Sequence, residues 1–171
     1  MIFDEKKYRF MYAALQEAEK ALDDLEIPVG AVVVRNNKII GRGYNQVEKL
    51  KDATAHAEMI ALTSASNQIG NWRLNECSIY VTLEPCIMCA GAMLQARIKR
   101  VVYGCHDPKA GAMGSLYNLE SDRRLNHRIE VESPILLGSP LVAVRNLSMA
   151  RQGLAYLLHP CAGNPPCDHG V

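Results

Sequence analysis

The chain has 171 residues, of which 49% are apolar and 22% are charged, and its formal net charge is +1. This size and composition predict one globular domain with a single hydrophobic core. No stretch approaches the ~18 consecutive apolar residues of a membrane span. Residues 1–7 end in four charged side chains and lack the apolar segment of a secretory signal. We therefore expect a cytoplasmic protein with no membrane association, whose six cysteines are thiols or metal ligands rather than disulfides.

The small net charge conceals a basic segment. Residues 1–96 carry a net charge of −2 and residues 129–171 a net charge of −1, whereas residues 97–128 carry +4. Such a segment suits a partner that bears phosphate groups, although a +4 excess alone is better explained by a solvated surface. The basic residues of this segment are Arg97, Lys99, Arg100, Lys109, Arg123, Arg124 and Arg128.

The first elements that we expect are a helix and a β-hairpin. Apolar residues at steps of three and four predict an amphipathic helix from Asp4 to Leu25. Ile27-Pro28 ends this pattern. Two apolar runs then flank Asn36-Asn37, which is typical of a hairpin turn. The runs are Val29–Val34 and Lys38–Gly41.

The chain then alternates helices and strands. A second helix is expected from Ala55 to about Gln68, with Thr54 as its N-cap. The elements expected after it are a strand, a helix and two more strands: Ser78–Leu83, Cys86–Ala96, Val101–Gly104 and Ile129–Val131. Because other segments separate these strands, they can lie parallel through crossovers. The predicted fold class is α/β, with a central mixed sheet between helices.

Two short motifs carry the chemistry. His56-Ala57-Glu58 is followed 27 residues later by Pro85-Cys86-Ile87-Met88-Cys89. One imidazole and two thiolates are zinc ligands that leave a fourth position open for water, whose pKa the metal lowers to about 7. Both cysteines project from one face of a helix start, where the helix dipole favours thiolates. Glu58 is then free to move protons between the water and a substrate nitrogen, as in hydrolytic removal of a ring amino group.

Each motif has another interpretation when taken singly. A histidine at a helix start is more often a surface residue, and a Cys-x-x-Cys pair also occurs in redox motifs and structural zinc sites. A closed structural site needs four protein ligands. Cys77 and Cys105 are candidates for the fourth, although we expect them to be small core residues. The joint occurrence and order of the two motifs favour a catalytic zinc site formed by His56, Cys86 and Cys89.

Residues around these motifs resemble a known family. The His-x-Glu and Pro-Cys-x-x-Cys signature resembles that of the zinc-dependent cytidine and deoxycytidylate deaminase superfamily. Within it, the chain is most similar to bacterial tRNA-specific adenosine deaminases, over about residues 4–132. The stretches that carry the similarity are Ile27–Ala31, Thr54–Glu58, Tyr80–Cys86, Met88–Ala92, Asp107–Ala112 and Asn126–Arg128.

The resemblance implies a fold and an activity. It implies a three-layer αβα fold with a central mixed five-stranded sheet in a deaminase domain of residues 1–132. It also implies a homodimer that converts the wobble adenosine of a tRNA anticodon loop to inosine, with one Zn²⁺ per subunit. Single-stranded loops suit such a pocket because their bases can be splayed out.

The resemblance also implies roles for individual residues. Glu58 would be the proton shuttle. Asn45 and the backbone near Val29 and Ala57 would hold the flipped base and its ribose. Asp107 and Lys109 would contact the flanking anticodon backbone.

The composition changes near residue 133. Residues 133–171 contain five of the eight prolines and only three charged side chains. We expect a divergent C-terminal segment, partly helical between residues 141 and 158 and then disordered. Bacterial members of the resembled family usually end in a charged amphipathic helix with an aromatic residue near the substrate loop, whereas Tyr156 is the only aromatic residue here. This segment also holds four side chains that can bind a metal, although we favour a low-complexity tail over a second zinc site: His159, Cys161, Cys167 and His169.

Two alternatives to the tRNA substrate stay open. A deaminase of free bases or nucleosides, such as guanine deaminase, would use the same zinc site. A non-catalytic zinc-binding module would instead require a fourth protein ligand. Asn126-His127-Arg128 and the segment from Asp107 to Lys109 favour tRNA.

Overall fold

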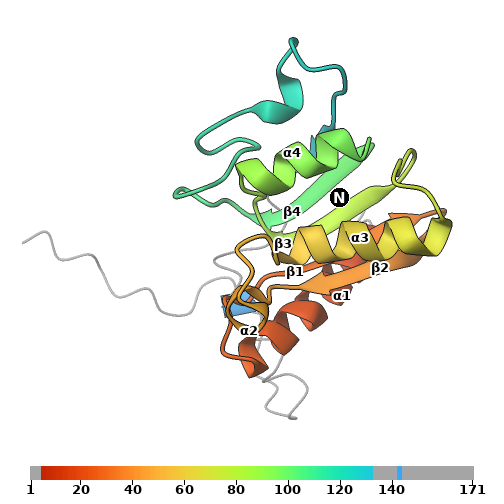
Figure 1. Cartoon of the computed structure of the whole chain (residues 1–171). Helices are drawn as coiled ribbons and strands as arrows, with labels where there is room; N and C mark the ends of the chain where they lie inside the picture. The colour runs from red at the N-terminus through yellow and green to blue at the C-terminus, as the bar shows by residue number, and fades with distance from the viewer. Residues whose placement is uncertain (1–4, 133–141, 144–171) are drawn as a thin grey trace, which may run out of the picture.

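A sheet of five strands in the order β2-β1-β3-β4-β5 forms the middle of the computed structural model, which describes residues 5–132 and 142–143 (Figure 1). Strand β1 is antiparallel to β2 and β3, whereas β3, β4 and β5 are parallel to one another. The sheet is therefore mixed, as predicted. The elements are α1 Glu5–Asp23, β1 Gly30–Arg35, β2 Lys38–Tyr44, α2 Val47–Leu50, α3 Ala57–Ile69, β3 Ser78–Leu83, α4 Ile87–Gln95, β4 Arg100–Cys105, η1 Leu119–Ser121 and β5 Glu130–Glu132.

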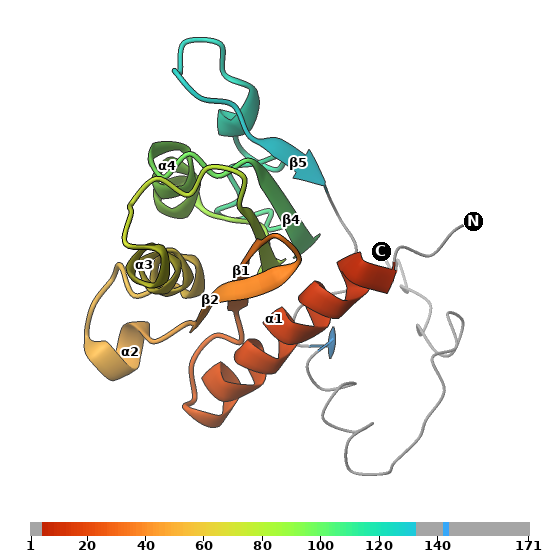
Figure 2. The same ribbon diagram turned by 90° about the vertical axis from the view of Figure 1, so that its right-hand side faces the viewer.

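Helices cover both faces of the sheet. Alternate strand residues point to opposite faces: Val33 packs in the cluster with α3 and α4, and Val32 packs in the cluster with α1. Figure 2 shows α1 on one side of the sheet and α3 with α4 on the other. The three-layer αβα prediction is thus confirmed. In the layer on the side away from α1, α3 and α4 lie side by side, and their N-termini lie at the same edge of the sheet.

A glycine sets how closely α3 approaches the sheet. A Cβ atom at Gly43 of β2 would overlap the carbonyl oxygen of Ala57, in the first turn of α3. Only a residue without a side chain permits this contact of strand and helix backbones. The contact places the start of α3 directly against β2.

Several details differ from the expectations. The N-cap of α3 is His56 and not Thr54, whose side chain instead hydrogen-bonds the Asp52 carboxylate at 2.7 Å. The four-residue helix α2 was not expected, because so short an element has no periodic pattern. The hairpin turn does lie at Asn36 and Asn37, and both have the positive φ that a type I′ turn requires.

The tail lies mostly outside the described residues. Of the helix expected between residues 141 and 158, only the helical pair Val142 and Ala143 is described, and Ala143 packs beside Leu15 and Ala18 of α1. The four tail residues that were weighed as a second zinc site also lie outside. None of the helices in the described part of the chain is long and apolar enough to cross a membrane.

Candidate active site

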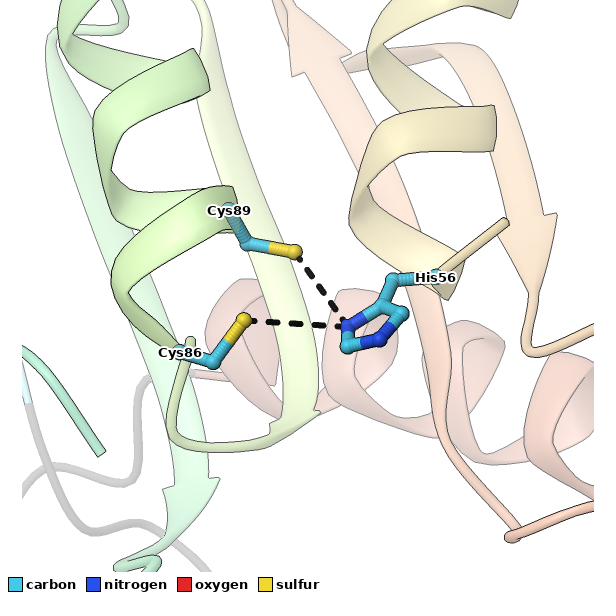
Figure 3. A group of neighbouring side chains, drawn as sticks. All are labelled: His56, Cys86 and Cys89. Atoms are coloured by element: carbon cyan, nitrogen blue, oxygen red, sulfur yellow. Dashed lines mark hydrogen bonds between the residues drawn. The ribbon is translucent and has the colours of Figure 1, made fainter. Parts of the chain in front are cut away.

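Three metal-ligating side chains meet where α3 and α4 begin. His56 is the N-cap of α3, Cys86 is the N-cap of α4, and Cys89 lies in the first turn of α4 (Figure 3). Nδ1 of His56 lies 3.7 Å from Sγ of Cys86 and 3.6 Å from Sγ of Cys89. Neither N-cap side chain caps its own helix. Both are therefore available to bind an ion between the two helix N-termini.

These distances fit zinc. Bonds of about 2.3 Å to sulfur and about 2.0–2.1 Å to nitrogen, at a tetrahedral angle, separate the two ligand atoms by roughly 3.5 Å. His56, Cys86 and Cys89 are the only such group among the residues that the structure describes. Cys77 and Cys105 are not part of it, since their thiols contact the backbone carbonyls of Asn75 and Thr82. The described residues thus offer three protein ligands to one ion, which is the number that catalytic zinc sites use.

The protonation of the ligands also suits a cation. A hydrogen bond from Cys89 lowers the pKa of Cys86 to about 4, with a further contribution from His56. The same hydrogen bond and burial raise the pKa of Cys89, so the two thiols favour a single negative charge. The hydrogen bond with Cys86 raises the pKa of His56. A zinc ion would take the place of the shared protons and favour both thiolates.

Glu58 lies beside the ligands without joining them. It is in the first turn of α3 and is only 4% exposed. Burial raises the pKa of its carboxyl group to about 7, and a neighbouring zinc ion would lower it again. A buried carboxyl group beside a metal-bound water is suited to accept and return a proton during a reaction.

A pocket of about 380 Å³ opens over this group. It lies beyond the carboxyl ends of the parallel strands β3 and β4, where ligands bind in open α/β sheets. Three of the residues expected to hold substrate line it together with His56, Glu58 and Cys86: Val29, Asn45 and Asp107. Sequence segments that are far apart are thus brought to one cavity.

The other two candidates do not line the pocket. Ala57 is fully buried, and its N–H is one of the four at the start of α3 that no helix carbonyl can accept. Lys109 is exposed, and its backbone N–H donates to the Asp107 carboxylate at 2.9 Å. Lys109 is not among the residues that line the cavity.

The basic segment is divided between two ends of the molecule. Lys109 follows β4 on the pocket side, whereas Arg97 and Arg100 lie at the end of α4 and the start of β4, on the far side. Arg97 donates to the backbone and side chain of Asn126, and His127 contacts the Ile98 carbonyl at 2.7 Å. These contacts fasten the chain before β5, so the Asn126-His127-Arg128 stretch has a structural role far from the zinc site.

Two pocket residues were missed by the sequence reasoning. Glu26 is 6% exposed, and its carboxylate accepts hydrogen bonds from the Asn45 amide at 3.1 Å and from the Lys49 backbone at 2.9 Å. Glu84 is 2% exposed; its burial opposes ionisation, but hydrogen bonds led by those from Ser115 hold its pKa below the usual range. One signal for Glu84 was present, because it follows a strand directly and precedes Pro85-Cys86.

The sequence model of the family described as "Cytidine and deoxycytidylate deaminase zinc-binding region" matches residues 4–105, which is more than half of the chain. The chain belongs to this deaminase family. The match contains both motifs, and with the ligand geometry it establishes zinc as the cofactor of this deaminase.

Individual relatives are also similar. The deaminase is 48% identical over 132 residues to a tRNA-specific adenosine deaminase of Streptococcus pyogenes serotype M1, with 77% of each chain covered. A solved structure from work on A-to-I editing by tRNA:A34 deaminases at the wobble position of transfer RNA is 42% identical, with a TM-score of 0.72 over 75% of this chain and 93% of the other. Guanine deaminase from Bacillus subtilis is 29% identical, with a TM-score of 0.58 over 89% and 97% of the two chains.

Proposed function

We propose that this protein deaminates the wobble adenosine of a tRNA anticodon loop to inosine. The observation that supports this choice of substrate is the 48% identity to a tRNA-specific adenosine deaminase over 77% of both chains. The open zinc site and the buried Glu58 supply the parts that the hydrolysis needs. The reaction consumes water and releases ammonia.

Different residues of the pocket serve metal binding and proton transfer. His56, Cys86 and Cys89 would hold a zinc ion, which would supply the activation of a water molecule at neutral pH. Glu58 accepts a proton from that water as its oxygen bonds C6 of the adenine ring, and delivers this proton to N1. It then transfers the remaining proton of the new hydroxyl to the 6-amino group, so that the C6–N bond breaks, ammonia leaves and C6 becomes the carbonyl of inosine.

We further propose substrate contacts for the remaining walls. Asn45 holds the base or ribose through the amide group that Glu26 orients. Val29 and the backbone near Ala57 contact the flipped nucleotide. Asp107 and Lys109 contact the flanking phosphodiester backbone, with Lys109 attracting phosphate and Asp107 shaping the wall.

A second candidate is deamination of free guanine. The likeness to guanine deaminase from Bacillus subtilis favours it, although the identity of 29% is lower than that to the tRNA-specific relative. The non-catalytic zinc module has less support, because the part of the chain that the structure describes offers three ligands and not four.

The decisive experiment compares substrates. The protein is incubated with an anticodon stem-loop that carries adenosine at the wobble position, with guanine, with cytidine and with free adenosine, and ammonia release is measured. We expect release from the stem-loop alone, and sequencing should locate inosine at the wobble position. A stem-loop with guanosine at that position is the matched control. Release from guanine but not from the stem-loop would replace the first candidate by the second.

We also propose that the protein is a cytoplasmic homodimer that pairs through α4. This helix has no charged residue, and Ile87 near its start is 51% exposed. Nearby apolar side chains, including Leu116 and Tyr117, are about half exposed as well. A Cβ atom at Gly91 of α4 would meet open space, so a Gly91→Arg variant should keep the monomer fold and disrupt a dimer. Analytical ultracentrifugation of both proteins tests this, and a monomeric wild-type protein would contradict it.

A further inference from the structure

One wall of the pocket is a loop with little regular structure of its own. Residues His106–Ser115, called here the β4 loop, follow β4 and contribute Asp107 and Ala110 to the cavity. Buried backbone N–H groups need acceptors. A single internal backbone bond closes part of the loop, from the Gly111 N–H to the Asp107 carbonyl at 2.9 Å. The Asp107 carboxylate accepts from the N–H groups of Lys109 and Ala110 within the loop, so the N–H groups of Asp107, Met113 and Ser115 need acceptors from outside it.

Glu84 supplies those acceptors from beneath the loop. One carboxylate oxygen accepts hydrogen bonds from the backbone N–H groups of Met113 and Ser115, at 3.0 and 2.9 Å. The other accepts the backbone N–H of Asp107 at 3.0 Å and the hydroxyl of Ser115. A ring nitrogen of His106 lies 3.2 Å from the same oxygen. One side chain thus binds both the beginning and the end of the β4 loop.

This cluster is not a nucleophilic triad, although it contains serine, histidine and glutamate. In a triad, one ring nitrogen contacts the serine and the other contacts the carboxylate. Here Nδ1 of His106 faces both Glu84 and Ser115, and the Ser115 hydroxyl donates to Glu84. The hydroxyl of Tyr103 donates to the Met113 carbonyl at 3.1 Å, so it can only accept from His106. The arrangement orients the loop and activates no nucleophile.

The fit between the loop and Glu84 is close. A Cβ atom at Gly111 would overlap the Glu84 carboxyl group, so a side chain at this position would push the carboxylate away from its hydrogen-bond partners. The next residue, Ala112, donates its N–H to the Pro85 carbonyl at 2.9 Å. Glu84 and Pro85 therefore join the β4 loop to the segment that leads directly to the zinc ligand Cys86.

The zinc ligands have separate support. Cys89, Ala90 and Met93 of α4 are fully buried in the core that this helix forms with the sheet. The start of α4 is consequently held by apolar packing. In the β4 loop, Ala112 and Met113 are also buried in this core, whereas Asp107 and Ser115 at its two ends are held by the Glu84 carboxylate. Removing the carboxylate should displace the loop and leave the zinc ligands in place.

We propose that Glu84 is a positioning residue that holds the β4 loop over the pocket, so that Asp107 faces the substrate nucleotide. This inference rests on the proposed function for the identity of the substrate. It assigns to Glu84 a role in substrate binding and none in zinc binding. No contact between Glu84 and the reacting atoms is needed.

The test replaces Glu84 by glutamine, which has the same shape. An amide NH₂ group cannot accept, so it would leave at least two of the loop donors unpaired. We expect KM for the anticodon stem-loop to rise about tenfold, as for the loss of roughly 1.4 kcal/mol of binding, with a smaller change in kcat. Zinc should stay at one per chain, and the amides of residues 107, 113 and 115 should exchange hydrogen faster. An unchanged KM with unchanged exchange, or zinc loss that parallels the loss of activity, would overturn the inference.

A second variant and a control keep the test decisive if Glu84→Gln folds poorly. Ser115→Ala removes only the hydroxyl donor to Glu84 and should raise KM in the same direction by a smaller factor; no rise in KM would count against the inference. Glu17→Gln is the control, because Glu17 is an equally buried carboxylate on α1 that binds Lys20 and Arg42 away from the pocket. The control should lower stability and leave KM and the loop exchange unchanged. If Glu17→Gln raised KM as much as Glu84→Gln does, the rise in KM of the Glu84 variant would reflect a general loss of stability and not loop positioning.

The two proposals fail in different ways. If the wild-type protein does not deaminate the stem-loop, the proposed function fails. Hydrogen exchange of the β4 loop in wild type and Glu84→Gln still decides whether Glu84 holds the loop. If the wild type is active and the exchange is unchanged, the positioning role fails alone.

Discussion

The two walls of the pocket are built in different ways. The zinc wall consists of the first turns of α3 and α4, where helix packing holds His56, Cys86 and Cys89 within reach of one ion. The opposite wall consists of loops, namely the β4 loop and the segments around Val29 and Asn45, held by the buried carboxylates Glu84 and Glu26. The contrast indicates that rigid elements carry the chemistry and loops carry substrate selection. Variants of the two walls should therefore differ in which kinetic parameter they change.

The largest effect should come from the zinc wall itself. Cys86→Ala or Cys89→Ala removes one of three protein ligands, so we expect loss of zinc and activity below detection. Zinc at a thousandfold excess over its dissociation constant stabilises a folded protein by about 4 kcal/mol, so the variants should also lose the difference in melting temperature between chelated and zinc-loaded samples. Metal analysis and thermal melting measure both. Cys77→Ala is the control and should keep its zinc, since Cys77 is a core residue outside the ligand group.

The next effect separates chemistry from metal binding within the same wall. Glu58→Ala should retain one zinc per chain and lose about 10²- to 10⁴-fold in kcat, as expected for loss of a proton-transfer group. Glu58→Gln should behave alike, because an amide does not carry the proton. Single-turnover assays with metal analysis provide the measurement. Turnover near the wild-type rate in either variant would exclude the proposed role.

A smaller effect is expected from the loop wall. Asn45→Ala should raise KM for the stem-loop about tenfold, because one buried hydrogen-bonding group is worth roughly 1–3 kcal/mol when its partner is left unpaired. The change in kcat should be smaller and the zinc content unchanged. Asn126→Ala removes the same side chain at the opposite end of the molecule and should leave KM unaltered. Equal effects of the two variants would contradict the assignment of Asn45 to the pocket.

The smallest effect should arise far from both walls. Arg97→Ala removes two hydrogen bonds to Asn126 and should lower the free energy of unfolding by about 0.5–1.5 kcal/mol. Arg97 has a φ of 62°, so Arg97→Gly should cost less because glycine adopts this conformation without strain. Chemical denaturation measures the difference. Neither variant should change KM, and a change would show that the far end does contact substrate.

Much of the fold was predictable because its elements have strong local patterns. The strand Ser78–Leu83 agrees with its prediction to the residue, since its β-branched and aromatic residues are bounded by polar segments. The helix boundaries agree within about two residues. The N-cap of α3 was predicted wrongly, because Thr54 is a good capping residue by type, but its hydroxyl is bound to Asp52.

The zinc wall of the candidate site could be predicted from the sequence, whereas the carboxylates that hold the loop wall could not. The zinc ligands lie in short motifs whose spacing reflects one helix turn, so Cys86 and Cys89 could be paired from the sequence. Glu26 and Glu84 have no such spacing, since their partners lie far along the chain, at Asn45 and at residues 106–115. The basic segment that the sequence predicts is likewise divided. Arg100 begins β4 and Cys105 ends it, so Arg100 and the residues after Cys105 lie at opposite ends of this strand.

The sequence by itself determined the ligand types and their order and predicted Glu58 as the proton carrier, because metal chemistry depends on side-chain identity at helical spacing. It also determined the α/β alternation, since hydrophobic periodicity is a local property. The tertiary structure decided which carboxylates organise the pocket and which basic residues lie far from it. These are contacts between segments that are distant in the sequence, and they form only when the parallel strands bring their carboxyl ends to one edge of the sheet.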